Sequence, residues 1–257
     1  MRHWTEKFFV KKPELWRHFL DRGWRLSGIA VRGILKILKK YGISRGKVLE
    51  VACGNGRICI PIAKRGFEVT GVDISESYIE DAKRRAVKHK VQSHFICGDM
   101  RRLNRLVRGE FDVVLSIWTS IGYYDKRTDQ KLFMVIARHL RKNGLFLVLN
   151  TMSQEYLVNH YCDSIYNETD KYLVLHRNNK FDRFHSVNRE TWVFYEKKDK
   201  ALRYVDELEV ELRIYSLSEI IEMAETAGLK FVEAYHNIRD FAPARPDSVI
   251  NVVFQKG

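Results

Sequence analysis

A glycine-containing loop and two acids follow short apolar runs in the first half of this 257-residue chain. The loop, residues 52–57, comes directly after the run Lys47–Val51, and its glycines suit a backbone that turns sharply while a ligand approaches closely. Asp73 ends a second run, where a carboxylate is placed to accept hydrogen bonds from ribose hydroxyls. A third run leads into Gly98-Asp99-Met100. This spacing predicts a site for a cofactor that contains a ribose.

A nicotinamide dinucleotide is one such cofactor, and the loop argues against it. The dinucleotide fingerprint places a third glycine three residues after the second, so that helix and strand pack closely. Cys59 stands at that position. Glu50, an acid upstream of the first glycine, also departs from that fingerprint. We therefore disfavour NAD(P) binding.

Four motifs in order resemble those of the class I S-adenosylmethionine-dependent methyltransferases. The loop and its preceding acid match the first motif of that family, with Ala52 where glycine is commonest. Asp73 matches the ribose-binding acid, and residues 98–100 match the turn beside the adenine. Residues 141–146 resemble the turn into the fifth strand, with a proline and one glycine replaced. The resemblance implies S-adenosylmethionine as the cofactor and S-adenosylhomocysteine as the product.

The same resemblance implies which positions bind the cofactor. They lie in the loop, after the second and third strands, and at the end of a fourth strand. These positions are Glu50, Ala52, Cys53, Gly54, Asn55, Gly56, Arg57, Asp73, Ile74, Ser75, Asp99, Met100, Ser116 and Ile117.

The chemistry of methyl transfer makes modest demands on the protein. A sulfonium is a good leaving group, so the reaction needs an in-line approach, and it needs a base only where the acceptor is protonated. Candidate bases are Tyr123, Tyr124 and His185, although packing is the commoner role for such tyrosines. Residues 116–119 lack the Asn/Asp-Pro-Pro-Tyr/Phe motif that presents polar acceptors to a planar nitrogen. Its absence argues against methylation of nucleobase amino groups and glutamine amides.

Helix and strand patterns alternate along much of the chain. We therefore expect an α/β fold with a doubly wound, Rossmann-like sheet of seven strands. A capping box at Ser216 predicts the start of one helix. Further expected helices span 28–41, 76–90 and 125–143, and the expected later strands span 145–150, 230–236 and 248–255.

Residues 171–215 change to a two-residue alternation, and residues 197–200 form the turn of a predicted long hairpin. Such a segment predicts an antiparallel insertion into the parallel sheet. The resemblance implies that it covers the acceptor pocket, together with the loop 118–124. The predicted parts are an N-terminal helical arm (1–44), a core (45–152 and 216–257) and the insertion (153–215).

Positive charge is concentrated near the N-terminus. Residues 1–47 carry 13 Lys and Arg against three acids, and residues 83–108 carry nine against one, in a chain of net charge +13. The arm also contains seven aromatic residues, and basic plus aromatic surfaces bind phosphates and stack bases. The alternative is an amphipathic helix whose aromatic residues pack on the core while Lys and Arg stay outside.

Composition indicates an intracellular enzyme. The four cysteines form no Cys-x-x-Cys pair, metal-ligand spacing is absent, and no run reaches membrane-spanning length. We expect a cytoplasmic monomer or homodimer without a metal or a membrane partner. The leading hypothesis is methyl transfer to a small-molecule amine or hydroxyl. The alternatives are an RNA methyltransferase recruited by the basic arm, and a cofactor-binding module without transfer activity.

Overall fold

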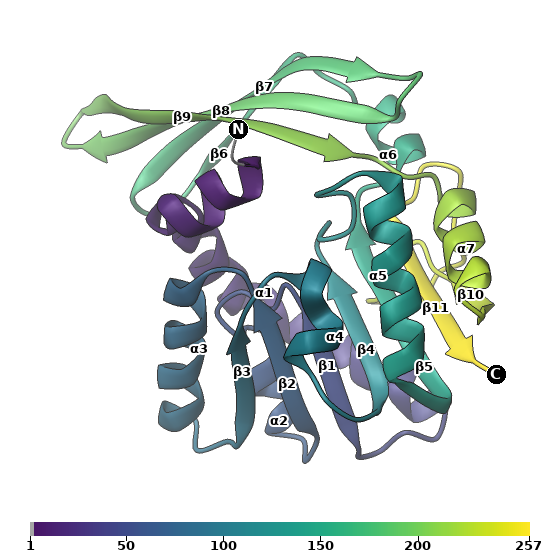
Figure 1. Ribbon diagram of the computed structural model, residues 1–257. Coiled ribbons are helices and arrows are strands. Elements are labelled where there is room, and N and C mark those ends of the chain that lie inside the picture. The colour runs from purple at the N-terminus through teal and green to yellow at the C-terminus, as the bar shows by residue number, and fades with distance from the viewer. Residues whose placement is uncertain (1–2) are drawn as a thin grey trace.

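The computed structural model describes residues 3–257, with Asn179 by its backbone alone, and contains a central seven-stranded sheet (Figure 1). The strands are β1 (Lys47–Val51), β2 (Glu68–Asp73), β3 (Ser93–Cys97), β4 (Phe111–Ile117), β5 (Leu140–Thr151), β10 (Leu229–Ala234) and β11 (Ile250–Lys256). Their order in the sheet is β10-β11-β5-β4-β1-β2-β3. Strands β1 to β5 pair in parallel, and β11 pairs antiparallel with both of its neighbours. The predicted Rossmann-like α/β fold is confirmed.

Helices cover both faces of this sheet. One face packs against α1 (Pro13–Lys40), α2 (Cys59–Ala63) and α3 (Glu76–Lys88). The other packs against α4 (Leu103–Leu106), α5 (Lys126–His139) and α7 (Leu217–Thr226), with the short helix η2 (Met100–Arg102) before α4. Strand β4 is buried along nearly its whole length, as a central strand covered on both faces must be.

Two predicted boundaries differ from the structure. The helix expected over 28–41 begins at Pro13, because the amphipathic pattern continues through the aromatic part of the arm. The helix expected to run to residue 143 ends at His139, and β5 begins there. Leu140 is fully buried and pairs with Phe111, so sheet packing ends the helix one turn early. The capping box at Ser216 is confirmed.

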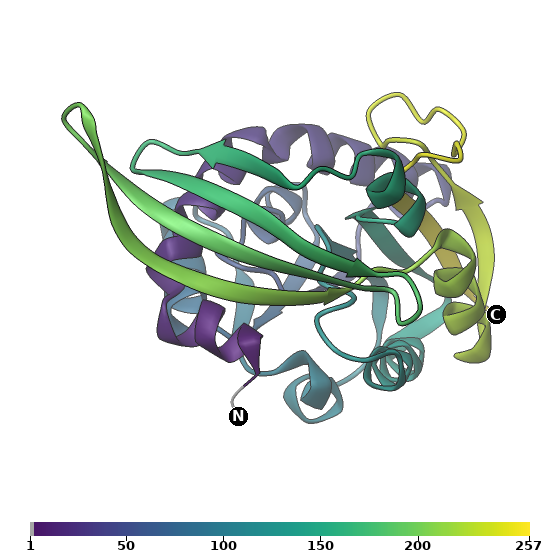
Figure 2. The ribbon, with the colours of Figure 1, turned by 90° about the horizontal axis from the view of Figure 1, so that it is seen from above.

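A second sheet lies above the carboxyl ends of the parallel strands (Figures 1 and 2). Its antiparallel strands are β6 (Ser164–Glu168), β7 (Tyr172–Asp182), β8 (Val187–Lys198) and β9 (Ala201–Arg213), in that order. The turn between β8 and β9 falls at residues 199–200, as predicted. The short helix α6 (Gln154–Asn159) links β5 to this sheet, so the sheet emerges at the edge where open α/β sheets bind ligands.

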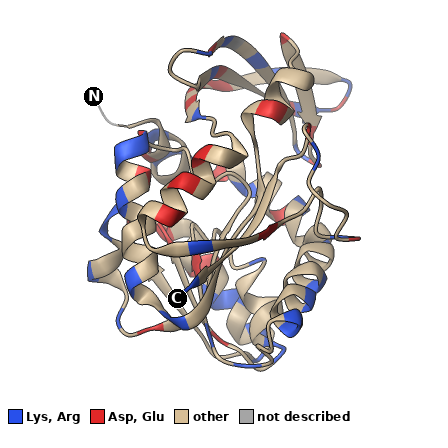
Figure 3. Ribbon diagram, turned by 90° about the vertical axis from the view of Figure 1, so that its right-hand side faces the viewer, with Lys and Arg blue, Asp and Glu red and all other residues tan. Residues whose placement is uncertain are grey.

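The N-terminal arm packs between the two sheets. The part of the arm that lies under the second sheet in Figure 1 is the short π-helix η1 (Glu6–Lys11) and the first half of α1. Phe8 and Phe9 are buried against Val174, Phe194 and other apolar side chains of β7 to β9. In the view of Figure 3, Lys and Arg lie on several helices and strand ends. The aromatic residues of the arm are therefore part of an apolar core.

Candidate functional site

The loop after β1 has the conformation that its glycines allow. Ala52, Gly54 and Gly56 adopt left-handed φ angles of 55°, 55° and 78°, a region that strains residues with a Cβ. A Cβ on Gly56 would lie 3.1 Å from the ring of Phe95, so this glycine lets the loop pack closely on the sheet. A Cβ on Gly54 would lie 3.2 Å from Leu20 of the arm. The loop is thus held tightly from below and covered by α1.

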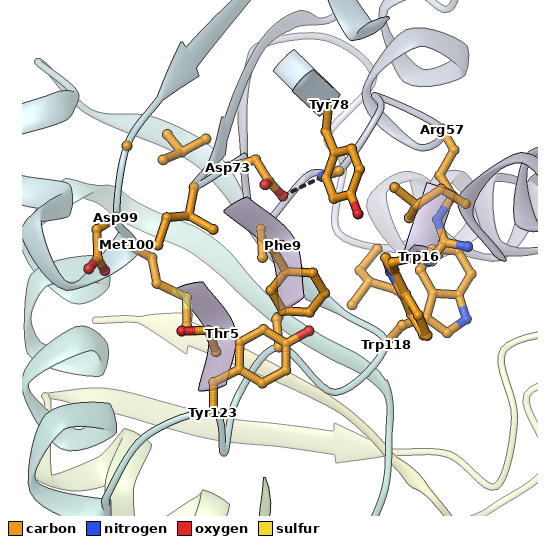
Figure 4. Close-up of a pocket in the computed structure, with 18 of the residues that line it drawn as sticks. Thr5, Phe9, Trp16, Arg57, Asp73, Tyr78, Asp99, Met100, Trp118 and Tyr123 are labelled. Atoms are coloured by element: carbon orange, nitrogen blue, oxygen red, sulfur yellow. Dashed lines mark hydrogen bonds between the residues drawn. The ribbon is translucent and has the colours of Figure 1, made fainter. Parts of the chain in front are cut away.

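Asp73 ends β2 directly beside this loop. Its Oδ2 accepts the N–H of Gly54 at 2.8 Å and its Oδ1 accepts the N–H of Ser75 at 2.9 Å, as Figure 4 shows for the first of these bonds. Burial raises the pKa of Asp73 to about 6, against the effect of the two backbone bonds. A carboxylate offers about four acceptor positions, so Asp73 can accept further hydrogen bonds from a ligand.

Asp99 follows β3 at the far side of the same edge. Its carboxylate accepts the backbone N–H of Arg101 at 2.8 Å and Nε of the same residue at 2.7 Å. Burial would raise its pKa, but these hydrogen bonds outweigh burial and hold the pKa of Asp99 below its usual value. The neighbouring Met100 is buried and offers an apolar surface. This turn thus presents an ionised carboxylate, that of Asp99, next to the apolar side chain of Met100.

These residues surround a first cavity at the carboxyl ends of the parallel strands (Figure 4). Its lining is Thr5, Phe9, Trp16, Leu20, Ala52, Gly54, Arg57, Val72, Asp73, Ile74, Tyr78, Gly98, Asp99, Met100, Ile117, Trp118, Ser120, Tyr123 and Tyr124. The lining therefore includes most of the predicted cofactor positions. It also includes four arm residues and Tyr78, which the sequence did not indicate. Tyr78 donates a hydrogen bond to the carbonyl of Pro13, and so joins α3 to the start of α1.

The other predicted cofactor positions lie outside this lining. They are Glu50, Cys53, Asn55, Gly56, Ser75 and Ser116. Glu50 is buried behind the loop, where its carboxylate accepts the thiol of Cys59 at 2.8 Å and burial raises its pKa to about 7. Asn55 donates to Asp21 of the arm at 3.2 Å. Glu50 thus supports the loop from behind, and Asn55 links the loop to α1.

Arg57 lies at one end of the first cavity. Its guanidinium stacks over the ring of Trp118, 3.7 Å from the ring centre, and passes α1 at Gly23, where a Cβ would be 1.9 Å from Nη1. Burial lowers the pKa of Arg57 to about 10, so the group stays charged at neutral pH. Within residues 3–257 it has no carboxylate or carbonyl partner, which leaves it available to an anionic ligand group.

The two predicted tyrosines both line the first cavity. Tyr123 faces Phe9, with ring centres 5.6 Å apart, and burial raises the pKa of its phenol, so it stays protonated at neutral pH. Tyr124 lies 3.4 Å from the Thr5 hydroxyl, and Arg101 stacks on its ring. His185 lies elsewhere. It is exposed in the turn after β7 and forms a hydrogen bond with Asp182 at 2.8 Å. His185 lines neither this cavity nor the second cavity described below, so the geometry does not support its predicted catalytic role.

The loop that carries these tyrosines is fixed to the second sheet by a buried junction. The N–H of Gly122 donates to Asp129 of α5 at 2.9 Å, and the hydroxyl of Tyr215 donates to the same carboxylate oxygen at 2.9 Å. The carbonyl of Gly122 accepts the N–H of Arg213, the last residue of β9, at 2.8 Å. These bonds connect the end of β9 to the residue that precedes Tyr123.

A second, larger cavity of about 550 Å³ lies between the arm and the second sheet. Its lining is Trp4, Phe8, Phe9, Trp16, Phe19, Arg22, Gly23, Leu26, Arg57, Trp118, Thr119, Tyr123, Met152, Ile165, Asn167, His176, Glu190, Trp192, Val210 and Leu212. Pockets of this size, mostly apolar with a few polar groups, are typical of small-molecule sites. Five residues line both cavities and form what we call the shared wall: Phe9, Trp16, Arg57, Trp118 and Tyr123.

The core of this chain is similar in sequence to known methyltransferases. Residues 48–144 match a family model described as a methyltransferase domain. A protein of Geobacillus sp. (strain WCH70), whose name assigns it provisionally to the methyltransferases, is 26% identical over 99% of this chain and 97% of its own. A ubiquinone biosynthesis O-methyltransferase of Rickettsia canadensis is 30% identical over 49% of this chain and 52% of its own.

Solved structures share the fold over nearly the whole chain. An S-adenosylmethionine-dependent methyltransferase from Clostridium acetobutylicum superposes with a TM-score of 0.80 at 17% identity, covering 95% of this chain and 98% of that one. An amino pentose methyltransferase from Micromonospora echinaspora, solved with S-adenosylmethionine bound, gives 0.71 at 16% identity, covering 97% and 98%. The likeness therefore includes the second sheet and the arm as well as the core.

Proposed function

We propose that this chain, a class I S-adenosylmethionine-dependent methyltransferase, transfers a methyl group to a small-molecule acceptor bound in the second cavity. The observation that carries the proposal is the shared wall. Two cavities that have five lining residues in common support a cofactor and an acceptor that lie side by side. Such proximity is what methyl transfer requires, because the acceptor atom must approach the methyl group in line with the sulfur.

The residues of the first cavity fit the cofactor. Asp73 has acceptor positions left for ribose hydroxyls, Ile74 and Met100 offer apolar surface to the adenine, and Arg57 is charged and unpaired beside the place for the methionine carboxylate. Gly54 lines the same cavity, and its positive φ gives the loop the sharp turn that brings its backbone to the cavity. When bound, S-adenosylmethionine supplies an electrophilic methyl group on a sulfonium.

In this assignment Tyr123 orients the acceptor rather than taking its proton. Its raised pKa keeps the phenol neutral, so the hydroxyl can donate or accept a hydrogen bond but is a poor base at pH 7. The other members of the shared wall are two indoles, a phenyl ring and a guanidinium, none of which accepts a proton at neutral pH. The wall thus supplies shape and orientation.

The basic and aromatic composition of the arm suggested RNA methylation as an alternative function. The packing of the arm disfavours this alternative. Trp16, which would stack a base, instead packs on Trp192 with ring centres 5.2 Å apart. Lys40 forms an ion pair with Glu233 at 2.5 Å, and the ammonium of Lys36 lies over the ring of Phe241. Aromatic and basic groups engaged in this way offer little to a polymer.

The test measures release of S-adenosylhomocysteine from the full chain with two sets of substrates. One set is a panel of small amines and alcohols, and the other is bulk RNA at low and high salt. We expect turnover with members of the small-molecule panel and none with RNA, with Asp73→Ala as an inactive control. Turnover restricted to RNA, with binding that weakens steeply as salt rises, would contradict the proposal.

A further inference from the structure

A carboxylate is buried on the face of the second sheet that lines the second cavity. Alternate residues of β8 point to this face, and Glu190 lies among them with 8% of its surface exposed. Its cross-strand neighbour on β9 is Val210, which is also buried. An acid in such a setting is costly unless it is paired or serves a ligand.

The partners of Glu190 satisfy its hydrogen bonds without neutralising its charge. Oε2 accepts the indole N–H of Trp192 at 2.5 Å, and Oε1 accepts the side-chain amide of Asn188 at 2.6 Å. Both donors are neutral. Among the residues that the structure describes, no Lys or Arg nitrogen lies within 4.0 Å of this carboxylate. The closest basic group is Nδ1 of His176, at 3.9 Å.

His176 packs beside the acid. Its Nε2 lies 3.0 Å from the side-chain amide nitrogen of Asn167, and its ring lies edge-on against Trp192, with ring centres 4.0 Å apart. Within the part of the chain that the structure describes, Glu190 therefore has two neutral hydrogen-bond donors and no Lys or Arg partner.

The rest of the cavity is suited to a positive group. Its lining contains eight aromatic rings, among them Trp16, Phe19 and Trp192, and the faces of such rings attract ammonium groups, most strongly away from water. The two arginines of the lining do not pair with Glu190. Arg22 is exposed and donates to the carbonyl of Glu168, while Arg57 belongs to the wall toward the first cavity.

We propose that the methyl acceptor carries an amino group that is protonated at neutral pH, and that Glu190 binds this ammonium inside the aromatic cavity. The inference rests on the proposed function, because it names the acceptor class of that site. The ammonium replaces solvent at the carboxylate with a charge-assisted hydrogen bond and contacts the surrounding ring faces. Trp192 and Asn188 hold the carboxylate in place, and His176 restricts its other side.

The experiment measures binding, not turnover, so that it succeeds or fails independently of methyl transfer. Benzylamine, phenethylamine and tryptamine are titrated against the full chain saturated with S-adenosylhomocysteine, in parallel with benzyl alcohol, phenethyl alcohol and tryptophol. Each alcohol matches one amine in shape but has no charge. We expect at least one amine to bind about tenfold or more tightly than its alcohol, as a charge-assisted bond implies.

Three variants locate the source of this preference. Glu190→Gln keeps the size and the hydrogen-bonding capacity of the side chain, and should reduce the preference to about twofold or less. Glu190→Asp retains the charge and should retain a preference, even if the protein is less stable. Glu209→Gln makes the same charge change on the exposed face of β9 and should have no effect.

Cofactor binding, measured in the same samples, shows that each variant is folded. A protein that binds S-adenosylhomocysteine but binds no amine, or binds amines and alcohols equally, overturns the inference. So does an amine preference that survives in Glu190→Gln. Absence of turnover together with the expected amine binding would count against the proposed function and not against the role of Glu190.

Discussion

The two cavities are built from different kinds of structure. The first is formed largely by loops at the ends of the parallel strands, where Asp73 is held by two backbone N–H groups, and four residues of the arm complete its lining. The second is formed largely by side chains of the arm and of an antiparallel sheet, elements that pack on each other through aromatic rings such as Phe8 and Phe194. Under the proposed assignment, cofactor binding therefore depends on backbone geometry, whereas acceptor binding depends on side-chain packing.

The largest effect is expected at Asp73. Asp73→Ala removes the proposed acceptor of the ribose hydroxyls and also leaves the N–H of Gly54 without its partner. Each lost charge-assisted bond costs about 1.5–3 kcal/mol, so affinity for S-adenosylmethionine should fall by about 100-fold or more. Calorimetry measures this directly. An Asp73→Ala protein that binds the cofactor as the wild type does would show that the first cavity is not the cofactor site.

Gly122 tests how the two regions are joined. Its φ is +100°, and an added Cβ would lie 2.1 Å from the carbonyl oxygen of Arg213, so Gly122→Ala should lower the free energy of unfolding by about 2–3 kcal/mol. The matched control is Gly42→Ala, since Gly42 also has a positive φ, of +73°, but nothing within 4 Å of its Cβ position. Denaturant unfolding compares the two. Equal losses in both variants would show that the junction adds nothing beyond backbone strain.

A smaller effect is expected from pH. Burial raises the pKa of Asp73 to about 6, and ribose hydroxyls bond best to the ionised form. Cofactor affinity should therefore be fully present above pH 7 and decline as the pH falls through 6, becoming about tenfold weaker at pH 5. In Asp73→Asn the affinity should be lower throughout and nearly independent of pH over this range. Persistence of the slope in that variant would point to another titrating group, such as Glu50.

Much of the first cavity could be predicted from the sequence, because its signals are local. Glycines before a helix, an acid at a strand end and the capping box at Ser216 each depend on a few neighbouring residues. The fold and the hairpin turn at 199–200 followed for the same reason. Within residues 3–257, no helix has the length and apolar character needed to cross a membrane.

The second cavity could not be predicted in the same way. A two-residue period puts Glu190 and Trp192 on one face of β8, but nothing local in the sequence indicates that this face meets Phe8 and Trp16, which are distant in the chain. Aromatic residues in the arm are compatible with either a nucleic-acid surface or an amphipathic helix packed on the core, and only their packing in the structure separates the two. Residue type alone makes His185 a candidate base, and a hairpin turn places it in solvent.

Trp192→Ala most directly tests the proposal that the first cavity binds the cofactor and the second binds the acceptor. Trp192 lines the second cavity, holds Glu190 through its indole N–H and does not line the first. Affinity for S-adenosylmethionine should stay within about twofold of wild type, while kcat/KM for the acceptor falls by about tenfold or more. Tyr204→Ala, which removes a ring that is 55% exposed on β9, should change neither quantity. Loss of cofactor affinity in Trp192→Ala, or transfer at the wild-type rate, would contradict the account.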